Sequence, residues 1–288
     1  MNKKKLLALC LCVAMGATAI AGGTLAYFTD TDEKTNTFVA GNVEIVQNEK
    51  DRNGVDFVDD QALLPIVDDA KDANGYHTGG NYIDKIVTVT NTGSEEAFIR
   101  THIALPAALD DGPTAFDASK NILHWNGASA NDTFAAANPD GVDNDWYFGT
   151  STVTDWPSKA NEAEENKGWN FYQATVNDVV YNVYVATHGV AVKSGETTAP
   201  SLLGVYLDAK VDYNNDLGEY VLATDPNTAI GFDIDETEIL IISEAVQADG
   251  FENYEDQANV AFYALDKAFG EIGTYCPFEN GFVGKPQQ

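Results

Sequence analysis

The chain has 288 residues, of which 16 are Lys or Arg and 45 are Asp or Glu, so its formal net charge is −29. Hydrophobic residues make up 44% of it, which excludes a chain that is disordered throughout. The acidity argues against binding nucleic acid or anionic membrane surfaces, because both need clustered Lys and Arg. It favours solubility and cation binding.

Residues 1–26 have the pattern of a secretory signal peptide. Lysines at positions 3–5 precede an uncharged stretch that runs from residue 6 to residue 29 and is apolar as far as about Ile20. Small residues favour cleavage between Ala26 and Tyr27, and cleavage after Ala21 is an alternative. The stretch is also long enough for an uncleaved anchor. We expect cleavage, with membrane contact only through this segment beforehand; the mature chain then keeps 13 basic and 45 acidic residues.

Cleavage leaves Cys276 as the one cysteine of the mature chain, because Cys10 and Cys12 lie in the signal segment. We interpret Cys276 as a small buried hydrophobe. The alternative is a free thiol or an intermolecular disulfide.

Strand patterns dominate the mature chain. Residues 37–47 predict a first strand with Val43 and Ile45 on one face. A turn cluster at 91–94 predicts an antiparallel hairpin between the two strands that flank it, and Asn177-Asp178 predicts a tight hairpin. The further predicted strands are 82–90, 97–105, 169–176, 179–187, 202–211 and 238–246.

Helix patterns are sparse. Residues 115–125 predict one short helix. Residues 255–269 predict a second, because Ala258, Phe262, Leu265 and Phe269 recur at helical spacing and Gly270 follows as a C-cap.

These elements predict a mainly β protein, with an antiparallel β-sandwich or jelly roll and one or two peripheral helices. We expect a signal peptide at 1–26 and a single secreted domain at 27–288, with an insertion near 107–167.

Two N-terminal blocks resemble a known family. The first is GGTLAYFTD at residues 22–30, and the second is TNTFVAGNV at residues 35–43, with Phe38, Gly41 and Val43 at its marked positions. The blocks are similar to the SipW-dependent secreted proteins of Gram-positive bacteria, the TasA/camelysin (CalY) family. Residues 89–94 also resemble a later strand and turn of this family.

The resemblance implies a jelly-roll-like β-sandwich, export, and cleavage by a dedicated signal peptidase. For the best-known members it implies assembly into fibres of the extracellular biofilm matrix. The camelysin branch is described as a cell-surface metalloendopeptidase. We expect Phe28, Phe38, Val43 and Ile45 to mark the strand through which copies of this chain associate.

Catalytic motifs are missing from the sequence. A zinc protease usually carries His-Glu-x-x-His on a helix, and this chain has neither that motif nor Gly-x-Ser-x-Gly. Its histidines, His77, His102, His124 and His188, are isolated in sequence, and the convergence of His102 and His124 with an acidic residue is left open as an alternative. We therefore predict no catalytic residues.

Three acidic clusters favour calcium, which binds several oxygens close together. We prefer to interpret each as a solvated acidic loop, with calcium as the alternative and no certain cofactor. The clusters comprise Asp51, Asn53 and Asp56, then Asp140, Asp143 and Asp145, then Asp212, Asn214 and Asp216.

Aromatic residues gather at 146–148, 169–172 and 181–184. Their alternation in strands favours core packing, and an exposed glycan platform is the alternative.

We therefore expect a secreted structural protein of a Gram-positive cell surface or matrix, whose partners are further copies of itself and a dedicated signal peptidase. A secreted metal-dependent endopeptidase is the first alternative, and a glycan- or partner-binding surface module is the second.

Overall fold

The structure is a computed structural model that describes residues 29–32, 43–58, 61, 63–67, 78–110, 112, 121–125, 145–149, 170–230 and 238–278. Its strands are β1 (Thr29–Asp32), β2 (Ile45–Lys50), β3 (Ile83–Asn91), β4 (Ala97–Pro106), β5 (Leu123–Trp125), β6 (Trp146–Tyr147), β7 (Phe171–Val176), β8 (Val179–His188), β9 (Leu202–Leu207), β10 (Val211–Asn214), β11 (Glu219–Leu222), β12 (Asp225–Ala229) and β13 (Leu240–Gln247).

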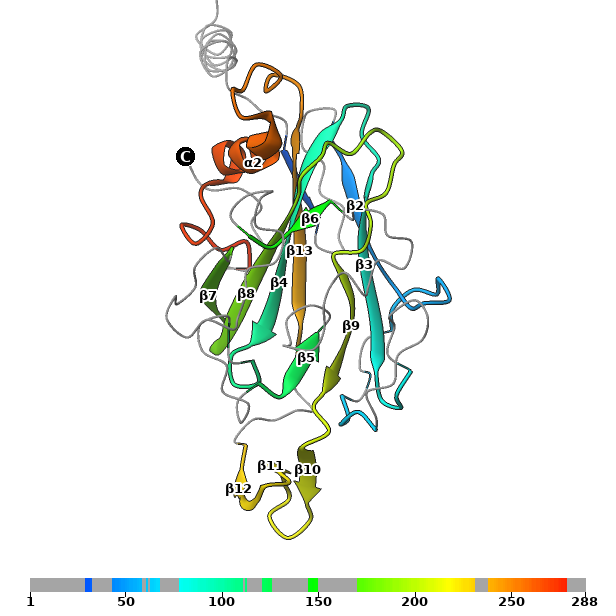
Figure 1. Cartoon of the computed structure of the whole chain (residues 1–288), viewed down its shortest axis with the longest axis vertical. Coiled ribbons are helices and arrows are strands. Elements are labelled where there is room, and N and C mark those ends of the chain that lie inside the picture. The colour runs from blue at the N-terminus through cyan, green and yellow to red at the C-terminus, as the bar shows by residue number, and fades with distance from the viewer. Residues whose placement is uncertain are drawn as a thin grey trace, which may run out of the picture.

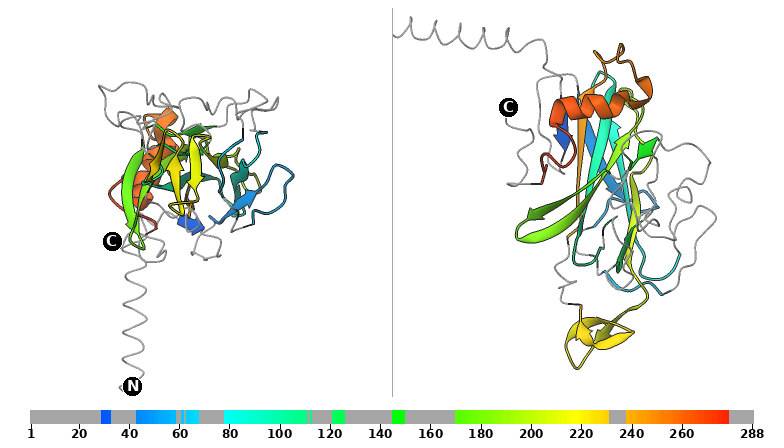
Figure 2. Two further views of the ribbon diagram at one scale, coloured as in Figure 1. Left: turned by 90° about the horizontal axis from the view of Figure 1, so that it is seen from below. Right: turned by 60° about the vertical axis from the view of Figure 1, so that its left-hand side comes forward.

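The strands form two facing sheets and a small third one (Figure 1). Sheet 1 has the order β1-β13-β4-β8-β6, with β7 also paired to β8, and sheet 2 has the order β2-β3-β9-β5. The third sheet, β10-β11-β12, projects from the lower end in Figure 1 and in the right-hand view of Figure 2. All pairings between these strands are antiparallel, so the predicted mainly β, antiparallel fold is confirmed.

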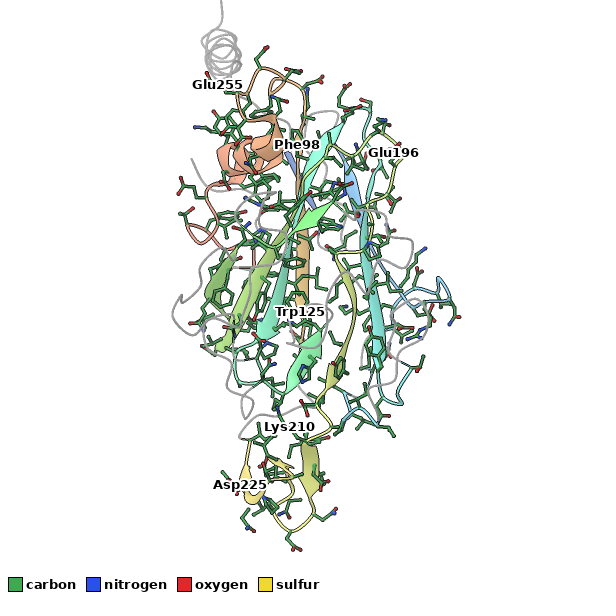
Figure 3. All side chains as sticks on the ribbon, viewed as in Figure 1. Phe98, Trp125, Glu196, Lys210, Asp225 and Glu255 are labelled. Atoms are coloured by element: carbon green, nitrogen blue, oxygen red, sulfur yellow. The ribbon has the colours of Figure 1, made fainter. Side chains whose placement is uncertain are left out.

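The main core lies between sheets 1 and 2. Alternate residues of β4, such as Ile99 and Ile103, pack there with Val87 and Val89 of β3, because successive side chains of a strand point to opposite faces. Figure 3 shows Trp125 of β5 between the two sheets, where it is fully buried. This shared core makes the pair of sheets a sandwich.

The tight hairpin predicted at Asn177-Asp178 is confirmed. Val176 of β7 pairs with Val179 of β8, and the two residues between them have φ values of 50° and 66°. Positive φ at both central positions is the conformation of a type I′ turn, which matches the twist of a two-residue hairpin.

The hairpin predicted across residues 91–94 is wrong. β3 lies in sheet 2 and β4 in sheet 1, where it pairs with β13 and β8. The Asn91 side chain turns the chain from one sheet to the other: its amide donates to the carbonyls of Glu95 and Val192, and its carbonyl accepts the Gly93 N–H. The turn is real, but it joins two layers instead of two neighbouring strands.

The C-terminal helix prediction is confirmed. A 3₁₀ turn at Gln257–Asn259 leads into α2 (Val260–Phe269), and Gly270 ends it with φ 107° and an N–H that donates to the Asp266 carbonyl. The predicted helix at 115–125 is wrong for Leu123–Trp125, which is β5, and residues 115–120 lie outside the described residues. Most of the predicted insertion near 107–167 lies outside them as well.

The outer face of sheet 1 is covered by α2 and by the segment that follows it. α2 packs its buried side, including Ala264, Leu265 and Phe269, against Phe98 and Val246. We call residues 270–278 the C-terminal strap; its Phe278 packs on a second outer cluster with Val183 and Ile242. Among the described residues, no helix is long and apolar enough to cross a membrane.

Candidate assembly edge

β1 forms the edge of sheet 1. Its four residues pair with β13 in the register Thr29–Val246, Asp30–Ala245, Thr31–Glu244 and Asp32–Ser243. Antiparallel pairing of this kind is made by main-chain N–H and C=O groups. The strand begins two residues after Tyr27, the predicted first residue of the mature chain.

The same strand also lies against sheet 2. β1 contacts β2, and β13 and β2 contact each other directly. Without β1, β13 would be the edge of sheet 1, while β2 is the edge of sheet 2. β1 therefore closes the side of the sandwich at which these two edges meet.

A polar bridge connects the two sheets next to Asp32, the residue at which β1 ends. Ser243 Oγ of β13 donates to Gln47 Oε1 of β2 at 2.7 Å, and it contacts Thr101 Oγ1 of β4 at 2.9 Å. Gln47 Nε2 donates to the Ile241 carbonyl of β13 at 3.3 Å and to Glu49 Oε1 at 3.0 Å. We call Gln47, Ser243 and Thr101 the inter-sheet bridge.

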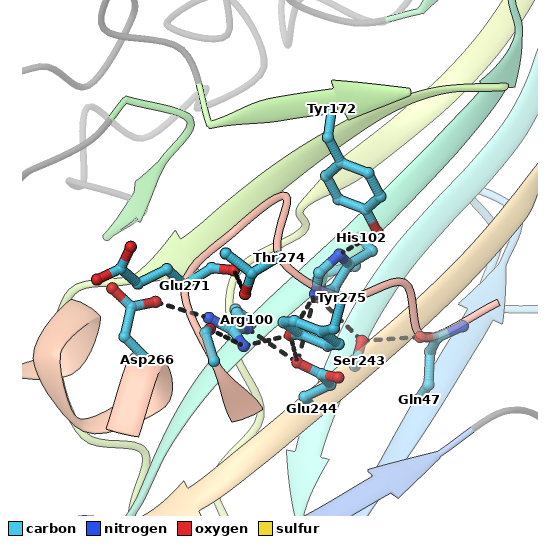
Figure 4. Close-up of polar contacts among 12 residues, drawn as sticks. Gln47, Arg100, His102, Tyr172, Ser243, Glu244, Asp266, Glu271, Thr274 and Tyr275 are labelled. Atoms are coloured by element: carbon cyan, nitrogen blue, oxygen red, sulfur yellow. Dashed lines mark hydrogen bonds and ion pairs between the residues drawn. The ribbon is translucent and has the colours of Figure 1, made fainter. Parts of the chain in front are cut away.

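The opposite face of β13 carries a buried charged cluster (Figure 4). Arg100 of β4 is 1% exposed, and its Nε donates to Glu244 Oε2 at 2.8 Å. Its other nitrogens donate to Asp266 of α2 at 3.1 Å, to the Gly270 carbonyl at 3.3 Å and to the Tyr275 hydroxyl. We call Arg100, His102, Glu244, Asp266 and Tyr275 the Arg100 cluster.

His102 and Tyr275 complete this cluster. His102 Nε2 lies 3.3 Å from Glu244 Oε2, and its Nδ1 lies 3.1 Å from the Tyr172 hydroxyl. The Tyr275 hydroxyl donates to Glu244 Oε2 at 2.5 Å, so the strap is tied to β13. His102 is fully buried and both of its ring nitrogens have partners, so neither is open to a substrate or a metal.

Burial and charge pull the pKa values of this cluster in different directions. Burial alone would raise the pKa of Glu244, but the charge of Arg100 and the hydrogen bonds from His102 and Tyr275 outweigh it and hold the pKa at about 2. Burial lowers the pKa of His102, which favours the neutral imidazole. Burial also raises the pKa of Tyr275, and the adjacent Glu244 adds to that shift. The cluster thus carries a buried Arg⁺–Glu⁻ pair with neutral donors around it, so loss of either charge would leave the other buried without its partner.

His124 does not join His102. It lies on β5 of sheet 2, stacks on Tyr206, and places its Nε2 2.8 Å from Asp208 Oδ2. Burial opposes ionisation of Asp208, yet bonds from His124 and Lys210 lower its pKa to about 2. His102 and His124 thus contact two different carboxylates, Glu244 and Asp208. The described residues hold no group of three or more His, Cys, Asp or Glu placed to bind a metal ion.

The other described histidine, His188, hydrogen-bonds through Nδ1 to the Val190 carbonyl, and burial lowers its pKa. Cys276 lies half-buried in the strap, hydrogen-bonds to Tyr172 and forms no disulfide. His77, Cys10 and Cys12 lie outside the described residues.

The first and third acidic clusters form turns. Asp51 Oδ1 accepts the N–H groups of Asn53 and Val55, and the Val55 bond lowers the pKa of Asp51. Asn214 Oδ1 accepts the N–H groups of Asp216 and Leu217. These oxygens are used by the backbone, as expected of solvated acidic turns.

Some of the remaining predicted positions lie within the described residues, and the others lie outside them. Val43 and Ile45 are buried in the main core, and the strand that contains Ile45 runs to Lys50. Asp56 follows the first acidic turn, Asp212 lies on β10, and Asp145 precedes β6. The predicted residues that lie outside the described part of the chain are Ala26, Tyr27, Phe28, Phe38, Asp140 and Asp143.

The aromatic groups pack mainly as predicted. Trp146, Phe148, Tyr181 and Tyr184 are buried, and Trp125 packs against Phe148 and Tyr184. These side chains build the core and do not form an exposed platform.

Comparison with known protein families matches the N-terminal part of the chain. Residues 1–61 match the model of the camelysin metallo-endopeptidase family. No curated protein and no solved structure matches the chain. The family match confirms the resemblance to the TasA/camelysin family that the two N-terminal blocks predict, and it rests on the first 61 residues of the chain.

Proposed function

We propose that this protein is a secreted structural protein of a Gram-positive cell surface or biofilm matrix, which forms fibres by exchanging β1 between copies. The observation that supports the proposal most strongly is the place of β1. This strand begins two residues after the predicted first residue, Tyr27. It pairs with β13 through main-chain groups and contacts β2, so it lies where the edges of the two sheets meet.

A strand at the chain terminus can make the same pairing with another copy. Main-chain bonds supply the affinity and do not depend on which copy provides the strand. When β1 of each copy fills the edge of the next, the contact is head-to-tail and propagates without closing. The family to which residues 1–61 are matched is associated with the cell surface or extracellular space.

Cleavage is the proposed trigger. In this proposal, the signal segment that precedes β1 in the chain blocks the head-to-tail contact with another copy until it is removed. A dedicated signal peptidase of the SipW type would release it at Tyr27. We therefore expect the uncleaved precursor to stay monomeric.

Electron microscopy of two purified chains tests the proposal. A chain that starts at Tyr27 should form fibres, whereas a chain that starts at Asn36 lacks β1 and should remain monomeric. A synthetic peptide of residues 27–36, added to the first chain in excess, should fill the open edges and shorten the fibres. The proposal is wrong if the chain that starts at Asn36 polymerises equally well.

A secreted metal-dependent endopeptidase is the second candidate, because the matched family carries that description. Casein cleavage by the purified mature chain, stopped by a chelator and restored by metal, would support it. Fibres without proteolysis support the structural function.

A further inference from the structure

The sequence of β1 does not define its own register. Its four residues are Thr-Asp-Thr-Asp, a two-residue repeat. A slip of two residues along β13 places the same residue types opposite β13 again, and polar strands of this kind specify register weakly. Some feature of β13 or its neighbours must therefore set where β1 pairs.

The inter-sheet bridge lies at the point where the pairing ends. In an antiparallel strand, alternate residues point their N–H and C=O groups to the same edge. The Ile241 carbonyl therefore belongs to the same row as the groups of Ser243 and Ala245, which face β1. Gln47 Nε2 already donates to the Ile241 carbonyl at 3.3 Å, and β1 ends at Asp32, opposite Ser243.

We propose that Gln47 acts as a register stop for the exchanged strand: it occupies the next acceptor on β13 and so prevents β1 from slipping two residues toward Ile241. Gln47 is thus a positioning residue, and this inference rests on the proposed function. Ser243 orients it, because the Ser243 hydroxyl donates to Gln47 Oε1 at 2.7 Å. Thr101 in turn contacts Ser243 at 2.9 Å and ties the bridge to β4.

The role is separable from general stability. Gln47→Met keeps the length of the side chain and removes both hydrogen-bonding groups. Gln47→Lys keeps an N–H donor for the Ile241 carbonyl. Asn48→Leu is the matched control on the next residue of β2, because the Asn48 amide bonds to Val46 and Thr90 within sheet 2 and not to β13.

Disulfide trapping reads the register directly. In a mature chain with Cys276→Ser, the pair Thr29→Cys and Val246→Cys reports the native register. The pair Thr31→Cys and Ile242→Cys reports a slip of two residues, since Thr31 stands opposite Glu244 in the native pairing. Directly opposed residues lie within disulfide range, and residues two positions away do not.

We expect Gln47→Met to raise the ratio of slipped to native cross-link about tenfold, the effect of one hydrogen bond of about 1.4 kcal/mol. Ser243→Ala should move the ratio the same way by a smaller factor, and Gln47→Lys and Asn48→Leu should leave it unchanged. An unchanged ratio in Gln47→Met, or an equal rise in Asn48→Leu, would overturn the proposal.

Hydrogen exchange gives a second readout that needs no cysteines. In Gln47→Met, the protected amides of the N-terminal strand should shift relative to the parent chain, and in Asn48→Leu they should not. Both readouts report the register whether β1 pairs within one chain or between two. They therefore stand apart from the fibre assay, which alone tests whether β1 is exchanged.

Discussion

The edge of β13 and the outer face of the same strand are held by different kinds of contact. The edge pairs with β1 through main-chain groups in a repeating Thr-Asp sequence. The outer face carries Glu244, which is bound by Arg100, His102 and Tyr275 through specific side-chain contacts. Main-chain pairing can be made with the β1 strand of any copy of the chain. The side-chain contacts to Glu244 require the particular residues that this fold brings together. Under the proposed exchange, the acceptor strand β13 is held in its own chain by side-chain contacts, and the exchanged strand β1 is held by main-chain pairing.

The largest expected effect comes from breaking the side-chain contacts on the outer face. Arg100→Met leaves the Glu244 carboxylate buried without its cation, which should lower the free energy of unfolding by about 3–5 kcal/mol. Arg52→Met is the control, because its pair with Asp84 is more exposed and should cost at most about 1 kcal/mol. Urea unfolding followed by fluorescence measures both. Equal losses in the two variants would mean that the Arg100 cluster does not hold β13.

A smaller loss is expected when the strap is untied. Tyr275→Phe removes the hydroxyl that contacts both Glu244 and Arg100, so unfolding should become easier by about 1–3 kcal/mol. Tyr263→Phe serves as the control, because that tyrosine is more exposed on α2. A Tyr275→Phe chain as stable as the parent would show that the strap is held by its apolar contacts alone.

Acid should lower the free energy of unfolding, because three buried groups bind protons more readily in the unfolded chain than in the folded one. Burial lowers the pKa values of His102 and His188 in the folded chain. Below the unfolded pKa of about 6.5, the unfolded state therefore binds more protons, and the free energy of unfolding decreases as the pH is lowered. Glu244 adds a second loss between its unfolded pKa near 4.5 and its folded pKa of about 2. Urea midpoints between about pH 7 and pH 5 should fall less when both histidines are Gln. An identical slope would contradict this account.

The smallest effect is expected from calcium. The Asp51 and Asn214 oxygens already accept backbone N–H groups, so we expect the melting temperature in millimolar calcium to match that in a chelator. A site occupied at a hundredfold excess over its dissociation constant would instead stabilise the chain by about 2.7 kcal/mol. An upward shift of that size would show that the acidic turns bind the ion.

The strands were predictable from local alternation, because burial on one face leaves a two-residue period in the sequence. The pairing of the strands was harder to predict. The sequence at Asn91 indicates a turn, but no local pattern shows whether the next strand joins the same sheet or the facing one. The tight hairpin at Asn177-Asp178 was predictable because a two-residue loop requires positive φ, which Asn and Asp adopt more readily than most residues.

The Arg100 cluster escaped sequence reasoning for a different reason. Arg100 and Glu244 are separated by 144 positions, and an Arg on an alternating strand is expected to face solvent. α2 and the strap cover that face instead. The one sequence signal was the long run of apolar residues around Arg100 and His102, which is more typical of a strand buried on both faces.

Intermolecular disulfide formation tests the central claim most directly. Two populations of mature chain starting at Tyr27, both with Cys276→Ser, would carry either Thr29→Cys or Val246→Cys, and would be mixed before assembly. Exchange of β1 predicts disulfide-linked dimers that join one chain of each kind. It predicts none when the chains keep the signal segment, with Cys10 and Cys12 also replaced by Ser. Assembled fibres without such mixed dimers would contradict strand exchange.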